Sequence, residues 1–211
     1  MKKNLTIFIL FVALSISAQS PIIDINDEDF GTIPNAYYKD LGGIYNSLEG
    51  TWLYQSGTTS LKIKLRKREA VLVNGYIPYF EDFLFGEYEY IENGVVKVNT
   101  IPLLSNNYTV YNQYNLWSVA IMDNDNIPTC NSCPANTKRV SLDFEEPAND
   151  DIGIKASLFV YKKIENNVEK LIVSFQQESS PIGIKKSNNN QSSVFKEFSL
   201  PLGDYVLIKQ P

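Results

Sequence analysis

The chemistry open to this chain is limited first by the complete absence of histidine from its sequence. Histidine is the commonest general base and a frequent zinc ligand, so its absence excludes serine-histidine and cysteine-histidine dyads and histidine-ligated metals. Any catalysis would have to rest on carboxylates.

Two pairs of carboxylates have a spacing that would place them together. Glu87 with Glu89, and Asp143 with Glu145, stand two residues apart, and such residues share one face of a strand. Each pair could act jointly or bind a cation. Alternation with aromatic residues favours the other interpretation, in which both pairs lie on outward, solvated faces. We therefore expect no catalytic residue and a protein that is not an enzyme.

A breaker-rich loop contains a possible cation site. The run Asp123–Asn126 begins like a calcium loop, with acidic and amide side chains in succession. Pro128 takes the sixth position, where that loop needs glycine, and no glutamate closes its frame. We interpret the run as a turn, with a weak cation site as the alternative, and we expect no metal and no cofactor.

The two cysteines of the chain, Cys130 and Cys133, form a C-x-x-C pair in the same loop. A thioredoxin-like redox motif needs a preceding strand and a helix that begins at the first cysteine. Here Pro128 precedes the pair, Pro134 follows it, and strands are expected on both sides. This context predicts a local disulfide between Cys130 and Cys133. Redox activity and a metal site are the alternatives.

The elements that would position these residues are strands, and the clearest lies between Leu48 and Arg68. Leu61, Ile63 and Leu65 alternate there with three basic residues, which predicts one dry face and one solvated face. The alternative to a solvated basic face is a patch that binds polyanions. The formal net charge of −5 argues against nucleic acid as a partner.

Turn signals divide the rest of the chain into further short strands with no long amphipathic helix. This pattern predicts an all-β fold, an antiparallel meander of about eight to ten strands closed into a barrel, with a two-sheet β-sandwich as the alternative. Asn93 and Gly94 predict a hairpin. The expected strands are 76–92, 95–100, 108–122, 138–144, 152–163, 168–176 and 203–209.

Two aromatic pairs of the 76–92 strand fall on opposite parities, Phe83 with Phe85 and Tyr88 with Tyr90. A bulge inserts one extra residue and so reverses the alternation, and glycine tolerates the backbone that it requires. We therefore expect a bulge at Gly86 that brings both pairs to one face.

The N-terminus predicts export. Lys2 and Lys3 precede a short apolar run, and small residues up to Ala18 suit cleavage, so residues 1–19 are expected to be a secretory signal peptide. Residues 20–47 are expected to be an irregular arm, with a short helix within 37–45, and residues 48–211 a single barrel domain. After this leader, no run approaches about 18 apolar residues, so we expect no membrane span. The expected location is the periplasm or the extracellular space.

Gly50, Thr51 and Trp52, with Leu48 two residues before the glycine, resemble the opening of lipocalin and fatty-acid-binding-protein barrels. The resemblance implies that this turn begins the first strand, that Trp52 closes one end of the barrel, and that the interior takes small hydrophobic molecules. In those families an arginine of the last strand stacks on the tryptophan, and here Lys209 is the only basic residue near the end.

A longer resemblance covers most of the chain after the leader. The segments that begin at Tyr37, Glu49, Glu81 and Val206 are similar to those of an uncharacterised, domain-of-unknown-function family of short exported bacterial proteins, mostly of Bacteroidetes type. That family implies no activity or ligand.

Together these observations predict a lipocalin-like (calycin-like) barrel that binds a small apolar ligand. The alternative is a non-catalytic envelope interaction or structural module whose barrel is packed solid and whose protein partner is unknown. The chain has thirteen tyrosines and eleven phenylalanines, which could line a pocket or fill a core. The residues expected to line the cavity are Trp52, Tyr54, Leu61, Ile63, Leu65, Tyr88 and Tyr90.

Overall fold

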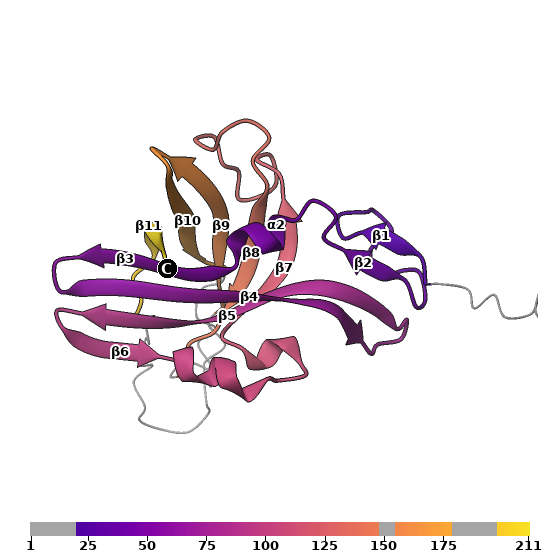
Figure 1. Cartoon of the computed structure of the whole chain (residues 1–211), viewed down its shortest axis with the longest axis horizontal. Coiled ribbons are helices and arrows are strands. Elements are labelled where there is room, and N and C mark those ends of the chain that lie inside the picture. Colours follow the sequence, from indigo (N-terminus) through magenta and orange to yellow (C-terminus); the bar gives the residue numbers. More distant parts are fainter. Residues whose placement is uncertain (1–19, 148–154, 179–197) are drawn as a thin grey trace, which may run out of the picture.

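The computed structural model describes residues 20–147, 155–178 and 198–211, so the predicted signal peptide lies outside the described residues. Eight antiparallel strands form a closed barrel, because β7 at the end of the sheet pairs back onto β5 (Figure 1). The all-β prediction and the closed meander are confirmed, and the sandwich alternative is wrong. In barrel order the strands are β5 (Tyr79–Glu92), β4 (Thr59–Val73), β3 (Gly50–Ser56), β11 (Gly203–Gln210), β10 (Val168–Gln177), β9 (Ala156–Glu165), β8 (Arg139–Phe144) and β7 (Leu116–Met122).

The inward side chains of all eight strands meet in one apolar core. In β4, Leu61, Ile63 and Leu65 are at most 1% exposed, whereas Arg66 on the opposite face is exposed. The alternation therefore sorts apolar side chains to the inside and charged ones to the outside, as predicted. Burial of such side chains is the main favourable term in the stability of the barrel.

The barrel closes at Gly86, where two strands approach β5 from opposite sides. Gly86 pairs with Leu65 of β4 and with Leu116 of β7. A Cβ atom on Gly86 would lie 2.4 Å from the carbonyl oxygen of Lys64 and 2.7 Å from Cδ2 of Leu65. Only glycine allows this close approach of the strands.

The bulge predicted at Gly86 is wrong. β5 passes through Gly86 in unbroken register with β4, and the irregularity in that pairing lies in the later half of β4. Alternation is therefore continuous along β5. Tyr88 and Tyr90 face the barrel interior, and Phe83 and Phe85 face outward into a second, smaller core.

This second core lies beneath the segment 101–115, on the outside of β5. The segment contains two 3-10 helices, η1 (Ile101–Asn106) and η2 (Tyr111–Gln113). Its tyrosines at 111 and 114 pack onto the outward phenylalanines, and Tyr108 packs against Tyr114. The strand predicted from Tyr108 is therefore wrong in its first half. A spacing of three residues suits a 3-10 turn, in which residues three apart are aligned, better than a strand.

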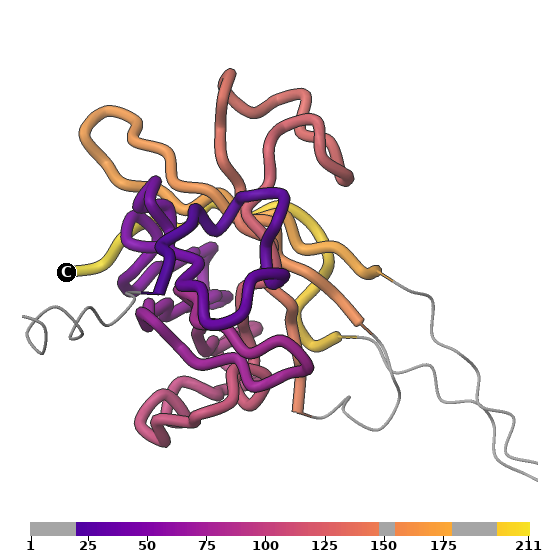
Figure 2. The backbone as a smooth tube through the Cα atoms, turned by 90° about the vertical axis from the view of Figure 1, so that its right-hand side faces the viewer, coloured from indigo at the N-terminus to yellow at the C-terminus, as the bar shows by residue number. Residues whose placement is uncertain are grey.

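The N-terminal arm extends the sheet beyond one end of the barrel. β1 (Ile22–Asp24) pairs in parallel with β2 (Tyr37–Lys39), and β2 pairs with β5. Figure 2 shows this arm, in indigo, in front of the barrel end. The short helix predicted within 37–45 lies later, as α2 (Ile44–Leu48), and it sends Tyr45 and Leu48 into the barrel core.

The hairpin predicted at Asn93 and Gly94 is confirmed, since it joins β5 to β6 (Val95–Asn99), a strand outside the barrel circuit. Across the described ranges, no helix is long and apolar enough to cross a membrane.

Candidate functional site

The seven residues expected to line a cavity lie together inside the barrel. Six of them are buried, and Tyr54 is half-buried and packs against the same cluster. They come from β3, β4 and β5, where Tyr54 stands opposite Leu61 and Leu61 opposite Tyr90. The three strands thus form a continuous apolar wall from the start of β3 to its end.

Trp52 lies buried near the start of β3, at one end of the barrel. Its Nε1–H group donates a hydrogen bond of 2.8 Å to the carbonyl oxygen of Leu48 in α2. Lys209 of β11 stands opposite Trp52 in the ladder, and its Nζ lies 5.4 Å from the centre of the Trp52 ring. Lys209 also forms an ion pair of 2.8 Å with Glu169. Lys209 therefore connects the ring of Trp52 to the charged side chain of Glu169.

Five aromatic residues lie where β3, β8 and β10 end and where β11 begins, and we call this group the mouth: Tyr54, Phe144, Phe175, Phe198 and Tyr205. The rings of Tyr54 and Tyr205 meet edge to face at 5.3 Å, and Phe198 contacts both Phe144 and Phe175. Tyr54, Phe198 and Tyr205 remain partly exposed, whereas Phe144 and Phe175 are buried. The apolar core is thus continuous with solvent-reached aromatic rings at this end.

Tyr88 has a buried polar atom inside the barrel. Its ring packs 4.8 Å from Phe144, the residue is 1% exposed, and its hydroxyl has no hydrogen-bond partner among the described residues. Burial, with the negative charges of Glu146 and Glu87, raises the pKa of the hydroxyl well above its ordinary value. The group therefore stays protonated and can donate a hydrogen bond.

Glu146 follows β8 at the mouth and is 4% exposed. It binds Ser199, whose backbone N–H donates to Oε2 at 2.8 Å and whose hydroxyl donates to Oε1. Ser199 stands between Phe198 and the buried Leu200. This contact fixes the segment that contributes Phe198 to the mouth.

The carboxylates of Glu87 and Glu89 have different partners, and the solvated position expected for Glu87 is wrong. Glu87 does point outward, but it is fully buried beneath the 101–115 segment and accepts a 2.8 Å hydrogen bond from the side-chain amide of Asn115. Burial raises its pKa to about 7, despite the hydrogen bonds that it accepts. Glu89 forms an ion pair of 2.8 Å with Lys62.

The second carboxylate pair lies outside the core. Asp143 is half-buried on β8, and Glu145 is exposed just beyond the strand. Burial, followed by the charge of Glu178, raises the pKa of Asp143. Their orientation agrees with the outward faces expected from alternation.

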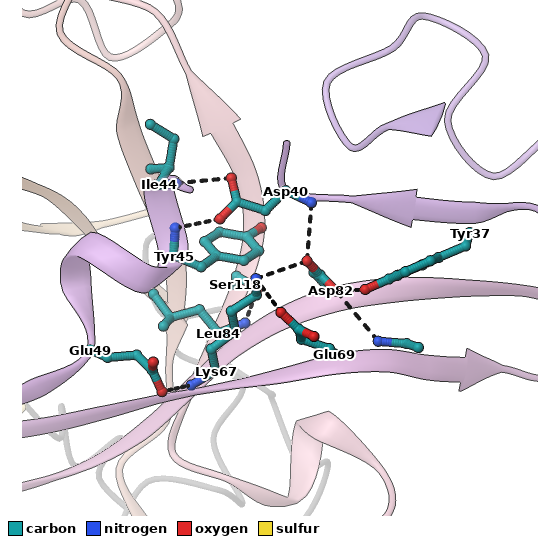
Figure 3. A network of polar contacts seen from close by, with 11 residues as sticks. Tyr37, Asp40, Ile44, Tyr45, Glu49, Lys67, Glu69, Asp82, Leu84 and Ser118 are labelled. Carbon is teal, nitrogen blue, oxygen red and sulfur yellow. Dashed lines mark hydrogen bonds and ion pairs between the residues drawn. The ribbon is translucent and has the colours of Figure 1, made fainter. Parts of the chain in front are cut away.

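A buried polar network that sequence patterns did not predict joins the arm to the barrel (Figure 3). The carboxylate of Asp82 accepts hydrogen bonds from the Tyr37 hydroxyl and from the backbone N–H of Asp40, and forms a 3.0 Å ion pair with Lys67. Burial raises the pKa of Asp82, but these hydrogen bonds outweigh it, so the pKa is lowered. Asp40 in turn binds the first backbone N–H groups of α2. Each acceptor is used by the fold, which indicates a structural role.

The disulfide predicted between Cys130 and Cys133 is present, with 5.4 Å between their Cα atoms. A disulfide indicates an oxidising, non-cytoplasmic environment. Buried Arg139, at the start of β8, donates to the backbone carbonyl oxygens of Asp123 and Asn126. These contacts attach the loop to β8. In the described part of the chain, no group of three or more acidic or cysteine side chains is arranged to hold a metal.

Comparison with known proteins places the chain in a family. Residues 1–210 match the model described as Family of unknown function (DUF6705). The chain belongs to this family. No curated protein and no solved structure matches it. The family brings no activity, so the barrel and its mouth are the basis for a functional proposal.

Proposed function

We propose that the protein is a non-catalytic, lipocalin-like carrier, exported to the periplasm or the extracellular space, that binds a small apolar molecule in its barrel. An eight-stranded barrel is just wide enough inside to be filled by side chains or to hold one small ligand. The observation that carries the proposal is the mouth, where partly exposed Tyr54, Phe198 and Tyr205 continue the buried apolar core to the surface. Aromatic rims of this kind favour apolar or ring-shaped molecules.

Dye binding by the purified protein tests this proposal. N-phenyl-1-naphthylamine, a neutral apolar dye, is expected to bind saturably, and native mass spectrometry is expected to detect the complex. Tyr54→Ala should weaken dye binding about tenfold, because it removes an aromatic contact at the mouth. Phe159→Ala is the matched control, since Phe159 is also half-buried but lies on the outer face of β9. Absence of uptake by the unmodified protein would defeat the proposal.

A second candidate is a barrel packed solid that acts through its surface. The observation that favours it is the near-complete burial of the inward residues, with Trp52 and Leu61 at 0% exposure. On the outside, five apolar residues of neighbouring strands lie side by side, and we call them the outer strip. Its members are Leu53, Tyr161, Ile172, Val206 and Ile208, of which Val206 is 47% and Ile208 37% exposed. Exposed apolar patches mark interaction surfaces.

Capture of envelope proteins by the immobilised protein and its variants distinguishes the two candidates. The second candidate predicts a partner that is retained by the unmodified protein and by Tyr54→Ala, and is lost when Val206 and Ile208 are both changed to serine. A carrier predicts that the serine variant still takes up the dye and that no such partner depends on the outer strip.

A further inference from the structure

The hydroxyl of Tyr88 is a buried hydrogen-bond donor that the described residues leave without an acceptor. The atom is buried, the residue is 1% exposed, and no partner lies within hydrogen-bond distance. Leaving a buried hydroxyl unsatisfied costs about 1–3 kcal/mol. A phenylalanine would fill the same space without that cost, so stability alone does not explain a tyrosine at this position.

The ring of Tyr88 packs against the aromatic residues of the mouth. Its ring contacts Phe144, which in turn contacts Phe175 at 4.6 Å and Phe198 at 5.6 Å. Burial, followed by the negative charge of Glu146, raises the pKa of the Tyr88 hydroxyl, so the two groups interact electrostatically. One donor is therefore placed at the inner edge of an aromatic site.

The charge of Glu146 restricts what could accept that hydrogen bond. Glu146 is 4% exposed, and its two carboxylate oxygens accept hydrogen bonds from Ser199. A second negative charge beside a buried carboxylate would be strongly unfavourable, because solvent screening there is weak. A neutral acceptor meets no such penalty.

We propose that the ligand of the barrel is a neutral molecule with an apolar, ring-shaped body and a hydroxyl or carbonyl oxygen, and that this oxygen accepts a hydrogen bond from Tyr88. This inference rests on the proposed carrier function and adds the chemical class of the ligand. The ring-shaped body would contact Phe144, Phe175 and Phe198. The oxygen would supply the acceptor that the Tyr88 hydroxyl lacks.

Three matched naphthalenes test the class of ligand by displacement of N-phenyl-1-naphthylamine. The competitors are 2-acetylnaphthalene, which has a carbonyl acceptor, 2-ethylnaphthalene, which has the same shape without one, and 2-naphthoate, which is an anion. Each is titrated against the unmodified protein and against Tyr88→Phe. The ratio of the acetyl to the ethyl affinity should fall about five- to tenfold in Tyr88→Phe, the effect of one lost hydrogen bond. The anion should be the weakest competitor for both proteins.

Thermal unfolding of the same variants distinguishes ligand recognition from a structural role. Tyr88→Phe should unfold at the same temperature as the unmodified protein or at a higher one, because it removes an unsatisfied group. Tyr114→Phe is the matched control: Tyr114 is also fully buried, but its hydroxyl accepts from Arg68 in the second core, outside the barrel. That variant should unfold at a lower temperature and leave the affinity ratio unchanged.

The outcomes separate the two proposals. Failure of the dye to bind the unmodified protein would refute the carrier function. A dye that binds, with an affinity ratio that Tyr88→Phe does not change, would overturn the present inference and leave the carrier function standing. Preferential binding of 2-naphthoate, or displacement by none of the three compounds, would overturn it as well.

Discussion

Replacing Gly86 with alanine should strongly destabilise the barrel, because β4, β5 and β7 meet there. The added Cβ would lie 2.4 Å from the backbone oxygen of Lys64 and 2.7 Å from Leu65. The oxygen cannot move away without opening the ladder between β4 and β5, in which Lys64 pairs with Glu87. Overpacking of this kind costs about 3 kcal/mol. For a chain of this length, that corresponds to a fall of about 6–12 °C in Tm.

Urea and thermal unfolding, followed by far-UV circular dichroism and by tryptophan fluorescence, measure the effect of Gly86→Ala. Gly75→Ala is the matched control, since a Cβ there would meet nothing nearer than the carbonyl oxygen of Ile77 at 4.0 Å. Its stability should change by less than about 1 kcal/mol. If Gly86→Ala unfolds at the same midpoint as the unmodified protein, the closure of the barrel at this residue is wrong.

Three further perturbations test other parts of the structure. The pKa of Glu87 is raised from 4.5 to about 7, so its contribution to stability is present below about pH 4.5 and is lost as the pH rises through 7. Glu87→Gln should therefore match the unmodified protein at about pH 4 and exceed its unfolding free energy by up to about 3 kcal/mol at about pH 8. Equal differences at both pH values would contradict the burial of Glu87. Changing Cys130 and Cys133 to serine should cost at most about 2 kcal/mol, because the disulfide closes a very short loop, and loss of the β-sheet circular dichroism signal would show a larger role. Lys209→Met should shift the fluorescence of Trp52 and lower the unfolding free energy by about 1 kcal/mol; an unchanged spectrum would argue against the contact.

The sequence was informative where one rule of local geometry decides the outcome. Side chains alternate along a strand, so Leu61, Ile63 and Leu65 could be assigned to the interior before any partner strand was known. The same rule correctly predicted that Tyr88 and Tyr90 share one face of β5, which is the face toward the barrel interior. It also explains why the residues expected to line the interior lie together there.

The errors arose where a distant segment decides the environment. Glu87 has the outward parity that the sequence predicted, but the 101–115 segment covers it, and nothing in the spacing of neighbouring residues shows this. Gly86 stands out in the sequence as a glycine within a predicted strand, but such a glycine can indicate either a bulge or a close approach of another strand. The close approach depends on β4 and β7 meeting β5, which is a property of the whole sheet.

Parts of the candidate site were also beyond sequence reasoning. The network around Asp82 depends on pairing between the arm and β5, and the contact between Glu146 and Ser199 joins residues that are far apart in the chain. A buried tyrosine without a partner cannot be recognised from its neighbours. Its one early signal was the inward parity of Tyr88 on an aromatic strand.

The most direct test of the carrier proposal is a two-dimensional NMR titration of the isotopically labelled protein with 2-acetylnaphthalene. The proposal predicts saturable shifts at Tyr54, Tyr88 and Tyr205, with little change at Val206 on the outer strip. Shifts confined to Val206 and its neighbours, with the mouth unaffected, would contradict it.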